Sequence, residues 1–151
     1  MKRVVSFFLC MCLIIAILAV PVSANPNSGM ILVSETVEYI DGDTYFVERI
    51  YIPEICSYSN GKTATKTAEG FYKGATVFSI SLTGHFTYDG TFAVATSASV
   101  AVRASVSGAS LNSKNAYTSG ASAIGSCSVS YVGVTLNKTV TLTCDANGNL
   151  S

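Results

Sequence analysis

The sequence predicts an all-β protein built as a single antiparallel β-sandwich. Hydrophobic and polar residues alternate along most of the chain, which is typical of strands with one buried face. Turn-forming Asp-Gly pairs separate the alternating runs, as they do between paired strands. No segment shows the 3.6-residue period of an amphipathic helix.

The first 24 residues have the pattern of a signal peptide. Lys2 and Arg3 precede an apolar run from Val4 to Val20, and small residues lead up to Ala24. This arrangement predicts cleavage after Ala24, with residues 25–151 forming the β-sandwich domain. The alternative is an uncleaved membrane anchor, although the run is slightly short of the roughly 20 residues that a spanning helix needs.

Composition excludes several classes of protein. The chain of 151 residues is 49% hydrophobic and 12% charged, with 9 basic and 9 acidic residues, which excludes a disordered chain. The balanced charge argues against binding to nucleic acid, which requires a clustered excess of Lys and Arg. Beyond the signal peptide no apolar run is long enough for membrane insertion. We therefore expect a secreted protein that is either free or associated with the cell surface.

The longest alternating run predicts a strand from Thr76 to Tyr88, with a bulge at Gly84. A three-residue loop over residues 88–90 would pair Phe86 with Phe92 and align the apolar faces of two strands. The expected inward residues of the second strand are Phe92, Val94, Val100 and Val102.

Other segments extend this prediction. Residues 30–40 and 44–52 form an expected hairpin around Asp41-Gly42-Asp43, and a phase change near Gly133 suggests another bulge. The polar stretch from Ser57 to Gly70 predicts an exposed loop. Residues 103–126 contain few large side chains, which fits either thin edge strands or a partly mobile segment.

Three cysteines follow the expected cleavage site, namely Cys56, Cys127 and Cys144. An exported protein with three cysteines can form one disulfide and keep one thiol. We predict a Cys127–Cys144 disulfide, because both residues lie on the apolar side of neighbouring strands. Pairs that include Cys56 are the alternatives. The Val-Thr-Leu-Thr-Cys stretch that ends at Cys144 is similar to a strand of immunoglobulin domains, in which the Cys faces inward. We expect the sandwich to be immunoglobulin-like in architecture, with a different cysteine placement.

Three stretches resemble a group of small secreted β-rich proteins from Gram-positive, largely clostridial, bacteria. The stretches are Glu35-Thr-Val-Glu-Tyr-Ile-Asp-Gly-Asp-Thr-Tyr, Leu82-Thr-Gly-His-Phe-Thr-Tyr-Asp-Gly90 and Thr141-Leu-Thr-Cys-Asp-Ala-Asn-Gly-Asn-Leu-Ser151. The resemblance extends over most of the chain after the expected signal peptide. The resemblance implies an exported, single-domain bacterial protein, and the group has no assigned activity.

Catalytic patterns are incomplete. Thr141-Leu-Thr-Cys144 is similar to the sortase motif, and His85 lies upstream, but the motif is one residue short and no Arg follows it. Glu38 and Glu48 share one face of the first hairpin, where paired carboxylates can act on glycosides or simply protect a sheet edge.

Metal binding is also weakly indicated. Asp145-Ala-Asn-Gly-Asn149 resembles part of a calcium loop, but no Glu follows it. One His and three widely spaced Cys match no zinc site. We therefore expect no metal and no cofactor.

Aromatic residues gather in the charged first half of the domain, where exposed rings can stack on sugars or anchor a partner. They are Tyr39, Tyr45, Tyr51, Tyr58, Phe71 and Tyr72. The resulting hypothesis is a non-enzymatic binding or surface-associated module whose partner is a glycan, an envelope component or a protein. The alternatives are a soluble effector or inhibitor that acts on another protein or cell, and a sortase-like cysteine transpeptidase.

Overall fold

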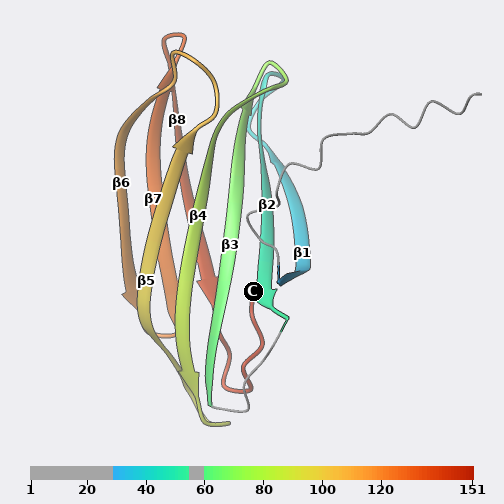
Figure 1. Cartoon of the computed structure of the whole chain (residues 1–151), viewed down its shortest axis with the longest axis vertical. Helices are drawn as coiled ribbons and strands as arrows, with labels where there is room; N and C mark the ends of the chain where they lie inside the picture. Colours follow the sequence, from blue (N-terminus) through green and yellow to red (C-terminus); the bar gives the residue numbers. More distant parts are fainter. Residues whose placement is uncertain (1–28, 55–59) are drawn as a thin grey trace, which may run out of the picture.

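The computed structural model describes residues 29–54 and 60–151, which form two antiparallel β-sheets packed against each other (Figure 1). The five-stranded sheet contains β1 (Met30–Tyr39), β2 (Thr44–Pro53), β3 (Gly61–Tyr72), β4 (Ala75–Tyr88) and β5 (Ala93–Ala104). The three-stranded sheet contains β6 (Ser110–Ser119), β7 (Ser122–Tyr131) and β8 (Val134–Thr143). The all-β prediction and the two antiparallel sheets of a sandwich are therefore confirmed.

Each sheet is a meander, in which every strand pairs with its neighbour in sequence and no connection crosses over a strand. β7 lies against β4 and β5, and β8 lies against β3. Because β6 also contacts β5, the smaller sheet covers the β3–β5 side of the larger one, and β1 lies beyond its margin (Figure 1). The expected signal peptide lies outside the described residues. Within them, no helix is long and apolar enough to cross a membrane.

The two sheets contribute side chains of different size to the core. The larger sheet supplies bulky buried residues, namely Phe46, Phe78, Ile80, Leu82 and Phe86. β7 faces them with Ala123, Gly125, Cys127 and Val129, and a Cβ atom at Gly125 would lie 3.1 Å from Leu82 Cδ1. The larger sheet and β7 thus pack closely because large side chains of the one meet small residues of the other, while β8 adds the buried side chains of Leu136, Val140 and Leu142.

The first hairpin forms as predicted. Val37 faces Val47, and Tyr39 faces Tyr45. The carboxylate of Asp41 closes the turn by accepting hydrogen bonds from the backbone N–H groups of Asp43 at 2.8 Å and Thr44 at 2.7 Å. A carboxylate that bonds to backbone amides two and three residues ahead is a common way to stabilise a turn.

The predicted exposed loop from Ser57 to Gly70 is wrong over its described part, because residues 61–72 form the central strand β3. The buried face of β3 consists of Ala64 and Ala68, which are fully buried. At Gly70 the ring of Phe78 occupies the space that a side chain would take, since a Cβ atom there would lie 2.4 Å from Phe78 Cε1. The inward face of β3 therefore has few large apolar residues of its own, because a bulky side chain from β4 fills the space there. A strand of this kind lacks the large apolar residues by which strands are usually recognised in a sequence.

The β4–β5 turn is longer than predicted. Phe86 pairs with Ala95 rather than with Phe92, and the ladder shifts between His85 and Phe86, near the expected bulge at Gly84. The Asp89 carboxylate accepts hydrogen bonds from the N–H groups of Thr91 and Phe92. Phe92 is thereby held in the turn, where its side chain is 61% exposed. Val94 is also exposed, while Val100 and Val102 face the core as expected.

The expected bulge at Gly133 is instead a tight turn between β7 and β8. Tyr131 pairs with Val134, and Val132 and Gly133 between them have φ angles of 49° and 76°. Two successive positive φ angles define the two-residue hairpin turn whose twist matches that of paired strands. Of the two alternatives for residues 103–126, the structure forms the strands, with β6 at a sheet edge.

Candidate functional site

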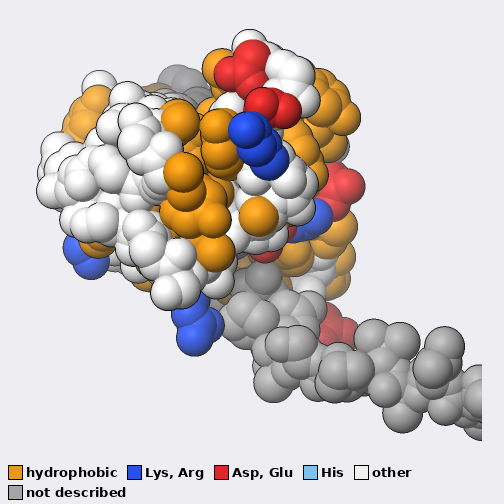
Figure 2. Space-filling view, turned by 90° about the horizontal axis from the view of Figure 1, so that it is seen from above, with side chains coloured by type: hydrophobic (Ala, Val, Ile, Leu, Met, Phe, Trp, Pro, Cys, Tyr) orange, Lys and Arg blue, Asp and Glu red, His pale blue; other side chains and the backbone are white. Residues whose placement is uncertain are grey.

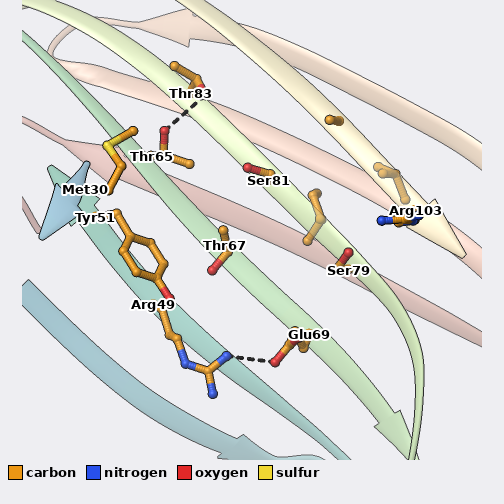
Figure 3. A pocket seen from close by; sticks show the side chains of 13 residues that line it. Met30, Arg49, Tyr51, Thr65, Thr67, Glu69, Ser79, Ser81, Thr83 and Arg103 are labelled. Atoms are coloured by element: carbon orange, nitrogen blue, oxygen red, sulfur yellow. Dashed lines mark hydrogen bonds and ion pairs between the residues drawn. The ribbon is translucent and has the colours of Figure 1, made fainter. Parts of the chain in front are cut away.

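The outer face of the five-stranded sheet carries a groove of about 620 Å³ (Figure 3). The residues around it come from β1 to β5, and most of them are polar. They include Met30, Arg49, Tyr51, Thr65, Thr67, Glu69, Ser79, Ser81, Thr83 and Arg103.

Hydroxyl groups form the floor of this groove. Ala64 and Ala68 face the core, so alternation along β3 turns Thr65 and Thr67 outward. On β4, Thr83 lies directly opposite Thr65, and the two hydroxyl oxygens are 3.2 Å apart. Ser79 and Ser81 continue the row (Figure 3). The groove therefore presents neutral hydrogen-bonding groups at the spacing of a sheet.

An ion-paired arginine forms one side of the groove. Arg49 Nε lies 2.6 Å from Glu35 Oε2, and its Nη1 lies 2.7 Å from Glu69 Oε2. The hydrogen bonds that Arg49 donates to Glu69 and Glu35 raise the pKa of Arg49, so the guanidinium stays charged. Two carboxylates on neighbouring strands hold its plane in a fixed orientation, which suits recognition of paired oxygens.

Aromatic rings lie on the same outer face. Tyr51 borders the groove, with its ring beside Arg49 and Met30 (Figure 3). At the other end of β2, the rings of Tyr45 and Phe71 stack with centroids 4.5 Å apart, and Tyr39 follows at 5.6 Å from Tyr45. Of the predicted aromatic residues, Tyr72 instead contacts Tyr131 of the other sheet, and Tyr58 lies outside the described residues.

A separate charged cluster joins the two sheets on their inner side. Lys138 Nζ lies 2.6 Å from Glu38 Oε2 and 2.7 Å from Glu48 Oε1, and it sits over the ring of Phe46. Burial alone would lower the pKa of Lys138, but its hydrogen bonds to Glu38 and Glu48 outweigh burial and raise that pKa.

Glu48 also binds Lys66 at 3.2 Å. Burial acts to raise the pKa of Glu48, but the Lys138 hydrogen bond and the Lys66 charge lower it overall. Glu38 and Glu48 therefore do approach each other on one face, as their parity suggested. In the structure both are bound to a lysine, which is the arrangement of a structural ion pair.

The predicted Cys127–Cys144 disulfide is not formed, and both residues are buried free thiols. Both lie on the apolar side of the strands as expected. However, the residue opposite Cys127 on β8 is Lys138. Cys144 lies six residues beyond Lys138, which corresponds to about 20 Å along a strand. A disulfide requires Cα atoms within about 7 Å. Burial raises the pKa of Cys127 to about 11, and Cys56 lies outside the described residues.

The residues of the incomplete sortase motif are not brought together. Cys144 is buried in the core, with only 1% of its surface exposed, and this burial raises the pKa of its thiol. His85 lies on the outer face of β4, where its Nδ1 is 2.8 Å from Thr63 Oγ1.

The acidic loop after β8 is a turn. The Asp145 carboxylate accepts hydrogen bonds from the N–H groups of Asn147 and Asn149, both at 2.8 Å. Among the residues that the structure describes, no group of three or more His, Cys, Asp or Glu could hold a metal ion.

The sequence pattern does not indicate the groove, because half of its floor lies in the polar stretch that predicts a loop. The available signal was the regular spacing of Thr63, Thr65 and Thr67 against Ala64 and Ala68, which is a strand pattern built from small residues. Comparison with protein-family models, with curated proteins and with solved structures finds no match to this chain.

Proposed function

We propose that this chain is an exported, non-enzymatic binding module and that the groove on its larger sheet binds a glycan. The observation that carries the proposal is the combination of a hydroxyl-lined floor, an oriented arginine and a bordering tyrosine on one rigid face. Sites on strands hold such groups in place better than sites on loops.

The groove chemistry matches that of a sugar. A glycan presents hydroxyl groups that both donate and accept hydrogen bonds, and the floor offers hydroxyls with the same dual capacity from Thr67, Ser79 and Ser81. Arg49 adds directed donors and Glu69 adds acceptors at one side. Because the charge of Arg49 is already paired with Glu35 and Glu69, this part of the groove favours polar ligands without demanding a charged one.

Aromatic rings supply the remaining element of recognition. The face of a sugar ring is largely apolar, and tyrosine combines an apolar ring with a polar hydroxyl. Tyr51 is placed to contact a ligand that lies in the groove. Tyr39, Tyr45 and Phe71 extend the aromatic surface toward the other end of the sheet, so an extended polymer could contact both regions.

The N-terminal pattern of residues 1–24 supports export, and an exported protein meets envelope polymers and extracellular glycans. As part of the same proposal, the domain is immunoglobulin-like in its two-layer architecture only. Its meander connections differ from the Greek-key connections of that fold.

The test is co-sedimentation of the protein, recovered as the expressing cell produces it, with isolated cell envelopes and with insoluble cellulose, chitin and peptidoglycan. We expect saturable binding to at least one of them. Tyr51→Ala should weaken this binding by about 2- to 10-fold, which is the contribution expected of one aromatic contact. Thr67→Val, which keeps the shape of the side chain and removes the hydroxyl, should also weaken it.

Two matched controls lie on the outer face of the smaller sheet. Tyr117→Ala removes an exposed tyrosine of β6, and Thr141→Val removes an exposed hydroxyl of β8. Neither change should alter binding. If both pairs of variants bind equally, the groove is not the site. If the protein stays in the supernatant with every polymer, the alternative of a soluble effector that acts on a protein replaces this proposal.

A further inference from the structure

The edge strand β1 exposes an unusual amount of apolar surface. Six of the eleven large hydrophobic side chains that are exposed in the described residues lie within residues 31–40. They are Ile31, Leu32, Val33, Val37, Tyr39 and Ile40. Hydrophobic side chains also line this side of the molecule in the end-on view (Figure 2). Apolar surface concentrated on one strand indicates a contact region.

The backbone of β1 is also open on one side. Within the described residues β1 pairs with β2 alone, and it contains neither Lys nor Pro, which commonly protect sheet edges. The only irregularity lies between Leu32 and Ser34, and from Ser34 to Tyr39 the register with β2 is unbroken. Half of β1 is therefore a regular strand that can accept another strand.

The acidic residues of β1 do not block this edge. Glu35 is bound to Arg49 at 2.6 Å, and Glu38 is bound to Lys138 at 2.6 Å. Arg49 lies on the neighbouring strand β2 and Lys138 lies on β8 of the other sheet, so the two carboxylates are compensated within the chain. A partner strand therefore needs no positive charge of its own.

The hydrogen-bond pattern shows which residues face the open edge. Ile40 donates its N–H to the Thr44 carbonyl at 3.0 Å, which places the even-numbered residues of β1 in the hydrogen-bonded positions toward β2. Because these positions alternate along an antiparallel strand, Glu35, Val37 and Tyr39 direct their backbone groups outward.

We propose that β1 pairs antiparallel with β1 of a second copy of this chain, about a two-fold axis through Val37. This register uses all three outward-facing residues, because Val37 meets Val37 of the second copy and Glu35 meets Tyr39 of the second copy. No glutamate faces another glutamate. Moving the axis to Glu35 would place like charges directly opposite each other, which destabilises a strand pair.

The result is a symmetric dimer in which two five-stranded sheets join into one sheet of ten strands. A two-fold interface uses the same surface of both copies, which fits a single strand that is complementary to itself. Both grooves then lie on the same face of the joined sheet. The proposal does not depend on what the grooves bind.

The first experiment measures mass by sedimentation equilibrium, with the protein recovered as the cell produces it. We expect a dimer for the unaltered protein and a monomer for Val37→Lys, which places two lysines opposite each other on the axis. The matched control is Val94→Lys, on an exposed residue of β5, which should stay dimeric. Circular dichroism establishes that both variants are folded. A monomeric unaltered protein, or a dimer unaffected by Val37→Lys, overturns the proposal.

The second experiment tests the register. In a hydrogen-bonded antiparallel pair the Cα atoms are about 5.5 Å apart, within the range of a disulfide. In a Cys56→Ser background, Val37→Cys should therefore form a covalent dimer under mild oxidation, and Val94→Cys should not. Equal cross-linking of the two variants overturns the register. Glycan co-sedimentation of the Val37→Lys monomer separates the two proposals, since the groove is intact in that variant.

Discussion

The two sheets of this protein are built by the same alternation of residues but present different chemistry to solvent. The outer face of the larger sheet carries Arg49 with its two carboxylate partners and a row of aromatic rings. Residues 105–151, which form the smaller sheet, contain only three charged side chains, Lys114, Lys138 and Asp145. Figure 2 shows this contrast, because the side chains over the smaller sheet are mostly uncharged and polar.

The difference extends into the core. The larger sheet supplies phenylalanines and branched aliphatic side chains, whereas β7 supplies Ala123, Gly125 and Cys127. The larger sheet thus provides all the phenylalanines of the core and the candidate binding surface, whereas the large buried residues of the smaller sheet are aliphatic. The smaller sheet acts as a close-fitting cover. Substitutions in each sheet can test this division of roles.

The largest effect is expected from Phe78→Ala. Phe78 is fully buried in β4 and also covers Gly70, so the substitution should lower the free energy of unfolding by about 3–5 kcal/mol. Val140→Ala, at a fully buried position in β8, removes less volume and should cost less. Urea unfolding of both variants measures the difference, and equal losses would contradict the division of roles.

Gly125→Val tests the close fit of the cover. The new side chain would meet Leu82 and Val100 within 3.5 Å, so we expect a loss of about 1–3 kcal/mol from overpacking. The control is Ser126→Val, which adds comparable bulk to the neighbouring residue on the outer face of β7. Thermal unfolding should show a lower Tm for the first variant only.

Lys138→Met tests the ion pairs that connect the sheets. The variant keeps an apolar stem over Phe46 but leaves Glu48 with Lys66 alone, so we expect a loss of about 1–3 kcal/mol. Lys114→Met on the exposed edge strand β6 is the control and should change stability by less than about 0.5 kcal/mol. Chemical unfolding measures both. A neutral Lys138→Met would show that the cluster adds nothing to sheet association.

The cysteines should behave as free thiols. In a Cys56→Ser background, dithiothreitol should leave the urea midpoint unchanged, and Cys144→Ala should cost about 1 kcal/mol. Both Cys127 and Cys144 should react with a thiol reagent only after unfolding, because both are buried. A Cys127–Cys144 disulfide would instead give a reductant-sensitive midpoint and a loss of about 2–4 kcal/mol.

Acidification should weaken the contact between the sheets gradually. The pKa of Glu48 in the folded protein lies below its ordinary value of 4.5, so its stabilisation is complete above pH 4.5 and is lost as the pH falls through the folded value. The raised pKa of Lys138 keeps its own contribution intact until the pH rises above 10.5. The Tm of the unaltered protein should therefore fall more steeply in acid than that of Glu48→Gln.

Residue alternation by itself determined much of this protein. It predicted the all-β class and the first hairpin, with Val37 facing Val47, and it placed Cys127 and Cys144 on buried faces. Such features depend on the two-residue period of a strand, which is a local property of the sequence. The sequence also shows the aromatic residues of β2 and β3 as a cluster.

Only the tertiary structure decided which segments became partners. β3 is a central strand because Phe46, Phe78 and their neighbours fill the space above its alanines, and the sequence of β3 alone contains no such information. The register of β7 with β8 places Lys138, and not Cys144, opposite Cys127. The two thiols therefore share a buried face but lie far apart along it. The groove likewise exists only because β1 to β5 bring residues from five segments onto one face, since pairing between distant segments is set by packing and register rather than by local pattern.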